Sequence, residues 1–222
     1  MKTWEQPMDL IRIDTQRAYE LIREKITSLD LSPGSSIDEG KLAKELKMGL
    51  VPVREALNLL AYDHLVETAA QCLFVSKVSI PDLQQISEIR ILLEPYCAQQ
   101  AAVHATTDDL VVLEALSQEQ SQIPPDRPKQ LFDLDHKFHQ AIARAAKNKY
   151  LEEILEDFYG HSKRAWFLVL PHLDFLSTAV ESHLDIVQAI KAQDSEGAAQ
   201  MMREHVQGFY EKVFEILRTT SE

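Results

Sequence analysis

Residues 41–76 read KLAKELKMGLVPVREALNLLAYDHLVETAAQCLFVS, and the spacing of their apolar residues changes along the stretch. Helical spacing predicts a short helix over residues 38–46, and a second helix starts near Pro52, a residue suited to a first helical turn. Residues 65–68 and 73–76 then predict two short strands joined by a small loop. A further helix is predicted upstream, at Thr15–Leu29, so the order of elements is that of a winged helix-turn-helix.

From Pro81 onward every long segment has helical spacing. The predicted helices lie near residues 81–105, 107–121, 128–146, 148–169, 172–192 and 194–218. The sequence therefore predicts a mainly α protein, with a winged helix-turn-helix over residues 10–79 followed by an all-helical bundle over residues 80–219.

Composition narrows the class of protein. The chain has 222 residues, 45% of them hydrophobic, which is typical of a globular protein with a core. Two cysteines, Cys72 and Cys97, suggest no disulfide framework. The N-terminus lacks the apolar run of a signal peptide, and no segment is apolar for long enough to span a membrane. We expect a cytoplasmic protein without membrane contact.

The net charge of −12 argues against nucleic acid as a partner, but the charge is unevenly distributed, which weakens that argument. Residues 1–80 carry ten basic and twelve acidic side chains, whereas residues 81–222 carry thirteen and 23. The acidity belongs mostly to the C-terminal part, which leaves room for a local basic face on the N-terminal part.

Four polar residues fall on the apolar stripes of predicted helices: Asp135, His139, His183 and His205. Asp135 and His139 are four residues apart, so they share one helix face. An isolated buried carboxylate costs several kcal/mol or takes up a proton, and a divalent metal removes that cost. Three imidazoles and one carboxylate suit zinc, nickel or manganese. The pattern predicts a metal site, with a hydrogen-bonded polar cluster as the alternative.

The runs Leu31–Gly34, Lys41–Leu46 and Pro52–Leu57 (PVREAL) resemble the head of the GntR family of bacterial transcription regulators. The C-terminal half resembles the helical effector-binding domain of that family, called FCD, whose metal pattern is Asp-x-x-x-His followed by one His on each of two later helices. The four residues above match that pattern, and the resemblance covers roughly residues 15–215. It implies a DNA-binding transcription regulator, not an enzyme, whose bundle binds a divalent metal and a small organic acid.

The chain departs from the family at two places. The family usually has a Ser-Arg-Thr type run before PVREAL, where this chain has Gly49, Leu50 and Val51. The tip of the wing usually carries Arg and Gly, where this chain has the run AAQCL at residues 69–73. Both changes remove groups that would touch phosphates or base edges.

The resemblance places the N-terminal part of the helix over residues 51–63 in the major groove of DNA. The expected DNA-binding residues are Arg54, Lys41, Lys44, Lys47, Val51 and Pro52. Arg54 suits a base or phosphate contact and the lysines suit phosphates. The alternative is that Arg54 pairs with nearby carboxylates while the lysines form a solvated face.

Arg90 and Arg164 are the predicted contacts of a small carboxylate effector, because a guanidinium can clamp a carboxylate through a charged fork. Arg90 has an alternative partner in Glu94, one helical turn away. His136 lies one residue off the ligand stripe, and we expect it to face solvent.

The leading hypothesis is a regulator that works as a homodimer on a two-fold symmetric operator, because one head reads too few base pairs to discriminate against a genome. A metal-dependent enzyme is one alternative, since open positions on an ion serve catalysis. An effector-binding protein with impaired DNA binding is another, on account of the two departures.

Overall fold

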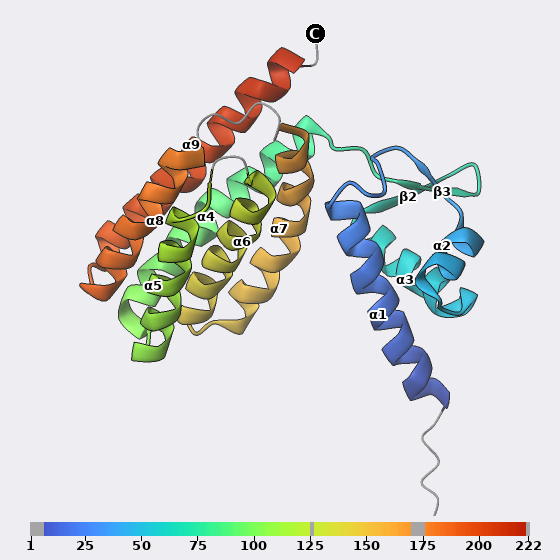
Figure 1. Ribbon diagram of the computed structural model, residues 1–222, viewed down its shortest axis with the longest axis horizontal. Coiled ribbons are helices and arrows are strands. Elements are labelled where there is room, and N and C mark those ends of the chain that lie inside the picture. The colour runs from blue at the N-terminus through green and yellow to red at the C-terminus, as the bar shows by residue number, and fades with distance from the viewer. Residues whose placement is uncertain (1–6, 125–126, 170–175, 221–222) are drawn as a thin grey trace, which may run out of the picture. The chain divides into compact units, whose positions relative to one another are not determined.

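The computed structural model describes residues 7–124, 127–169 and 176–220, and the chain divides into two compact units, Met1–Ser79 and Ile80–Glu222 (Figure 1). The first is a winged helix-turn-helix and the second is all-helical in its described part. The predicted mainly α fold class is therefore confirmed. In the part of the chain that the structure describes, no helix is both long and apolar enough to cross a bilayer.

The N-terminal unit, called the head below, packs α1 (Pro7–Thr27), α2 (Glu39–Leu46) and α3 (Leu50–Tyr62) around one apolar core. The core is built by side chains from each of these helices and from the hairpin: Ala18, Ile22, Ile26, Leu42, Val53, Leu57, Leu60, Leu65 and Val75. These are the inward positions of the helical spacing, so burial of the apolar stripes stabilises the head.

Local signals set the ends of the short helices. Asp38 caps α2, because its Oδ1 accepts a hydrogen bond of 2.9 Å from the backbone N–H of Lys41. Lys47 ends α2 in the left-handed region, at φ 55°. Gly49 then precedes α3, and Pro52 lies in the first turn of α3, where a missing N–H costs nothing.

The sheet of the head contains β1 (Ser36–Ile37), β2 (Val66–Ala69) and β3 (Cys72–Val75), with β3 pairing antiparallel to both others. The sequence predicted β2 and β3 but not β1, whose two residues are too few to show an alternation. Ala70 and Gln71 join β2 to β3 with φ angles of 49° and 64°. Both are left-handed, as a two-residue hairpin turn requires, although neither is Asn or Gly.

The second unit is called the helical unit below. Its helices are α4 (Ile80–His104), α5 (Thr107–Ser121), α6 (Pro128–Ala145), α7 (Lys149–Val169), α8 (Leu176–Lys191) and α9 (Ser195–Thr220). They agree with the predicted helices to within a few residues, except that the predicted start of α8 at residue 172 lies outside the described residues. α4 and α9 pack most extensively against each other, and α5 begins at a capping box of Thr106 and Asp109.

α4 continues through a proline. Pro95 is buried in the interior of α4, where it has no N–H to donate to the carbonyl of Ile91, four residues before it. That carbonyl accepts a hydrogen bond of 3.3 Å from Arg203 of α9 instead. A side chain of the neighbouring helix therefore replaces the donor that proline removes.

Candidate functional site

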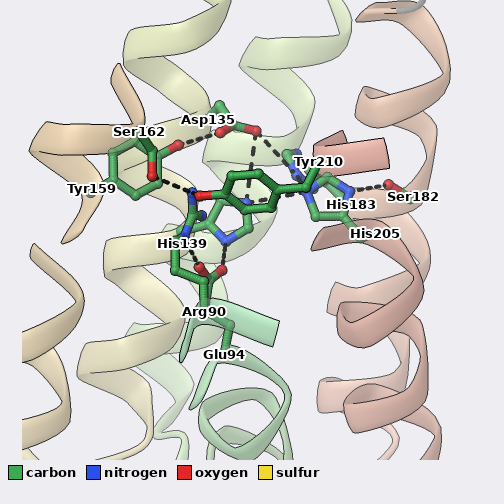
Figure 2. A network of polar contacts seen from close by, with 10 residues as sticks. All are labelled: Arg90, Glu94, Asp135, His139, Tyr159, Ser162, Ser182, His183, His205 and Tyr210. Carbon is green, nitrogen blue, oxygen red and sulfur yellow. Dashed lines mark hydrogen bonds and ion pairs between the residues drawn. The ribbon is translucent and has the colours of Figure 1, made fainter. Parts of the chain in front are cut away.

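The four polar residues that the sequence placed on apolar stripes lie together inside the helical unit (Figure 2). α6 supplies Asp135 and His139, α8 supplies His183 and α9 supplies His205. One ligand atom from each lies within 4.8 Å of the others. His183 is fully buried and His139 is 7% exposed, so the group is largely shielded from solvent.

The atoms that meet are Nε2 of the three imidazoles. The Nε2 of His205 lies 3.0 Å from that of His183 and 3.2 Å from that of His139. Oδ1 of Asp135 lies 3.5 Å from Nε2 of His183 and 3.8 Å from Nε2 of His139. Two ligands that share one ion at about 2.1 Å are about 3.0 Å apart at a right angle and about 3.4 Å apart at a tetrahedral angle. The spacing therefore fits four ligands of one ion.

The outer nitrogen of each imidazole, Nδ1, has its own partner. Nδ1 of His139 lies 2.5 Å from a carboxylate oxygen of Glu94 on α4. Nδ1 of His183 lies 2.5 Å from the amide oxygen of Gln120 on α5, and Nδ1 of His205 lies 2.8 Å from the hydroxyl of Ser182 on α8. The other oxygen of Asp135 accepts a hydrogen bond from the hydroxyl of Tyr159 on α7. Every one of the four residues is thus oriented by a partner that does not face the centre.

These partners decide where the protons lie. The amide oxygen of Gln120 can only accept, so His183 donates through Nδ1, while Nδ1 of His139 lies in ion-pair contact with Glu94. A neutral imidazole that carries its proton on Nδ1 has a bare lone pair on Nε2. The lone pair of His183 therefore faces the carboxylate of Asp135, whose Oδ1 lies 3.5 Å away, and a cation placed between them satisfies both.

The pKa values of the histidines follow from burial and from their neighbours. Burial, together with the imidazole of His139, lowers the pKa of His205 to about 4. Burial also lowers the pKa of His183 well below its ordinary value, helped by the other two imidazoles. Burial alone would lower the pKa of His139, but Glu94 and Asp135 outweigh it and raise that pKa. Neutral His183 and His205 are in the form that binds metal ions.

Arg90, expected to clamp an effector, is 4% exposed and already engaged. Its Nε donates to Glu94, and a terminal nitrogen donates to the hydroxyl of Tyr210 over 3.1 Å. The hydroxyl of Tyr210 in turn lies 2.7 Å from that of Ser162 (Figure 2). The structure thus contains the alternative that the sequence offered, a pair with Glu94, and any contact of Arg90 with an effector would have to compete with these bonds.

Arg164, the second predicted effector contact, is 3% exposed on α7, and burial lowers its pKa to about 10. His136 was expected to face solvent, but it is only partly exposed. Its ring stacks on that of Tyr159, with centroids 4.1 Å apart, and its Nε2 lies 2.7 Å from Glu156. A small pocket beside α6 and α7 is lined by His136 and Glu156 and reaches His139 and Glu94.

The predicted DNA-binding residues lie at the start of α3, on α2 and, for Lys47, at the C-cap of α2. Arg54 is exposed and forms an ion pair of 2.8 Å with Glu39, which is the alternative that the sequence left open. Val51 is 58% exposed, and the three lysines, Lys41, Lys44 and Lys47, are exposed as well. Pro52 does not fit the expectation, because it is buried in the first turn of α3, where its role is to start the helix.

Sequence reasoning missed Gln120, Ser182 and Tyr159 as partners of the central residues. Gln120 and Tyr159 are buried, and Ser182 lies one position before His183. Gln120 shares a helical stripe of α5 with Leu113 and Ser117, which is a sequence signal for an inward position, but its partner depends on which helix faces that stripe. Nothing in the sequence alone supplies that neighbour.

Comparisons with known proteins agree with this architecture. Residues 85–208 match the family model of the FCD domain, and residues 14–71 match that of the bacterial regulatory proteins of the gntR family. The chain is 26% identical over 209 residues to the HTH-type transcriptional repressor RspR of Escherichia coli (strain K12), covering 93% of this chain and 92% of RspR. It is 28% identical over 192 residues to the Nta operon transcriptional regulator of Aminobacter aminovorans, covering 86% and 90%.

Solved structures show the same fold. The structure of E. coli McbR/YncC superposes with a TM-score of 0.81 at 24% identity, covering 91% of this chain and 97% of that one. A GntR transcriptional regulator from Rhodococcus sp. RHA1 superposes with a TM-score of 0.74 at 18% identity, covering 90% and 97%. The relatives are named as regulators and not as enzymes. The chain therefore belongs to the GntR family of bacterial regulatory proteins, in the branch that carries an FCD domain, and is a DNA-binding transcription regulator.

Proposed function

We propose that this regulator binds a divalent metal ion, zinc, nickel or manganese, through Asp135, His139, His183 and His205. The observation that carries the proposal is the meeting of three Nε2 atoms, 3.0 and 3.2 Å apart, beside a carboxylate. Without an ion, the neutral Nε2 of His183 would lie 3.5 Å from the carboxylate of Asp135, so that two hydrogen-bond acceptors would face each other. Burial makes such repulsion costly.

The ion would in turn bind a small carboxylate effector. An octahedral ion keeps about two positions beyond four protein ligands. A single carboxylate, Asp135, leaves a divalent ion with a net positive charge, which favours an anionic ligand. Arg164, buried on α7, stays the predicted contact for the remainder of the effector. Arg90 would take part only by giving up a bond to Glu94 or Tyr210.

The head would bind a double-stranded DNA operator as part of a homodimer. Arg54 and Val51 are exposed at the start of α3, and the lysines of α2 supply charge for phosphates. Two heads on half-sites about one helical turn apart read enough base pairs for discrimination. The effector would change DNA affinity by binding one arrangement of the dimer more tightly than the other.

Elemental analysis of the purified full-length chain tests the metal. We expect about one divalent ion per chain, because the ligands form a single site. His183→Ala should lose most of that ion, whereas His104→Ala, an exposed histidine at the end of α4, should retain it. A wild-type protein that holds none of the three metals after exposure to each of them would refute the proposal.

Selection from a random duplex library, followed by DNA titration, tests the effector. The metal-loaded protein is titrated with the selected duplex in the presence and absence of small mono- and dicarboxylates. We expect at least one of them to change DNA affinity by about five-fold or more, the lower end of ordinary allosteric coupling. Unchanged affinity with all of them would refute the carboxylate effector and leave the metal site standing.

A further inference from the structure

The buried pair of Arg90 and Glu94 is linked to the candidate metal centre in two ways. Glu94 accepts from Arg90 through one oxygen and meets Nδ1 of His139 through the other, at 2.5 Å. The guanidinium of Arg90 also lies over the ring of Tyr159, 4.7 Å from its centroid. Tyr159 in turn donates to Asp135. One guanidinium therefore contacts the partners of two of the four central residues, His139 and Asp135.

We infer that Arg90 and Glu94 are positioning residues of the metal centre, and that Arg90 is not the clamp of an effector. The inference rests on the metal site proposed above. A carboxylate on Nδ1 fixes which nitrogen of His139 faces the ion and makes Nε2 a stronger donor. Arg90 fixes that carboxylate in turn, because Nε holds Glu94 while a terminal nitrogen holds Tyr210.

His139 differs from the other two histidines in the charge of the group that contacts its Nδ1. The partner of His183 is the neutral amide of Gln120, and the partner of His205 is the hydroxyl of Ser182. A hydrogen bond to an ionised group is roughly twice as strong as one between neutral groups. Glu94 should therefore contribute more to metal affinity than either neutral partner.

A purely structural ion pair would predict a different outcome. If Arg90 and Glu94 served only to hold α4 in the bundle, changing Glu94 would lower stability and leave the coordination of a bound ion unchanged. The positioning role predicts a change in the ion itself. The absorption spectrum of bound Co²⁺ reports its ligands directly, and competition with a chromophoric chelator reports affinity for Zn²⁺.

The test compares the wild-type full-length chain with Glu94→Gln, and with Glu88→Gln, an exposed glutamate on the same helix, as the matched control. A glutamine has one acceptor oxygen, so it cannot accept from Arg90 and His139 through two oxygens at once. We expect Glu94→Gln to weaken Zn²⁺ binding about ten-fold or more and to change the Co²⁺ spectrum, the usual size of such an effect being about 10- to 100-fold. Glu88→Gln should match the wild type.

Two further variants test the same inference if Glu94→Gln does not fold. Glu94→Asp keeps the buried charge but withdraws the carboxylate from His139, so it should weaken Zn²⁺ binding while the protein stays folded. Arg90→Lys keeps the charge opposite Glu94 without the fork, and should give an intermediate loss. Gln120→Ala, which removes a neutral partner, should cost less Zn²⁺ affinity than Glu94→Gln.

The outcomes separate the two proposals. A wild-type chain that binds Zn²⁺ while folded Glu94→Gln or Glu94→Asp binds it equally tightly, with the same Co²⁺ spectrum, would overturn the positioning role alone. A wild-type chain that binds neither Zn²⁺ nor Co²⁺ would overturn the metal site and this inference with it. Weaker binding in the Glu94 variants with a changed spectrum supports both.

Discussion

The head and the helical unit each contain an arginine–glutamate pair, Arg54–Glu39 and Arg90–Glu94. The side chain of Arg54 is 57% exposed and that of Glu39 25%, whereas both members of the second pair are 5% exposed. In the head, water competes for the pair, so under the proposed function a phosphate would replace Glu39 at little cost. In the helical unit, burial keeps water and ions from competing with either partner, and Tyr210 and His139 also contact the pair. The same two residue types thus form an exchangeable contact on the surface and a fixed one in the interior.

Removing one arginine from each pair should give the largest contrast. Arg90→Met leaves the carboxylate of Glu94 buried without its charge partner, and breaking a buried pair in this way costs about 3–5 kcal/mol. Arg54→Met should leave the free energy of unfolding unchanged within error. Chemical denaturation of the metal-free protein measures both. Equal effects of the two variants would contradict the contrast between them.

Removing the ion should act on the helical unit and spare the head. At a free ion concentration about 100 times the dissociation constant, an ion in the proposed site would stabilise the folded unit by about 2.7 kcal/mol. Chelation should therefore lower the melting temperature of the helical unit by about 5–10 °C. Site-resolved hydrogen exchange would show the loss of protection in α6, α8 and α9 and none in α3. Loss of protection in both units would contradict a site confined to one of them.

Changes at the exposed pair should alter DNA affinity without altering stability. Arg54→Ala should weaken binding to a selected operator by about ten-fold or more, as expected for a guanidinium that contacts a base or phosphate. Glu39→Gln should strengthen binding by a few-fold, because it frees Arg54 from a competing carboxylate. Titration at several salt concentrations measures both. If Glu39→Gln weakened binding, the pair would be a fixed part of the DNA-binding surface, like the buried pair of the other unit.

The smallest effect concerns the exposed turn of the head. Ala70 and Gln71 both adopt left-handed φ angles that Asn and Gly adopt more easily. Replacing them by Asn and Gly should raise the stability of the head by about 1 kcal/mol and leave metal binding unchanged. Thermal melting of the head signal checks this prediction. A lower melting temperature would mean that the side chains of Ala70 and Gln71 contribute more than their backbone strain costs.

Much of the fold could be predicted because it depends on local patterns. The apolar spacing along α4 to α9, the turn before α3 and the position of Pro52 each reflect forces acting within a few residues. β1 could not be predicted, since its two residues form a strand only through pairing with β3. The convergence of Asp135, His139, His183 and His205 followed from polar groups on apolar stripes, because stripes that face one core bring such groups together.

The partners of these groups could not be predicted in the same way. Gln120 and Tyr159 lie on helices whose rotation and register depend on packing across the bundle, which no single-helix pattern specifies. The role of Arg90 was ambiguous for the same reason: an effector and Glu94 both satisfy a guanidinium, and only the neighbourhood of His139 distinguishes them. In the head, exposed side chains such as the lysines of α2 form their hydrogen bonds with water, so the sequence does not specify a protein partner for them.

Pro95 has a practical consequence for work on shortened proteins. Because proline interrupts the backbone hydrogen bonds of α4, the carbonyl of Ile91 depends on Arg203, which lies two residues before His205 on α9. A truncation that removes the chain from residue 203 onward would delete the imidazole of His205 and would also remove the hydrogen bond to α4 near Glu94. Loss of ion binding by such a fragment therefore could not be assigned to the missing imidazole, and point substitutions are needed to separate the two causes.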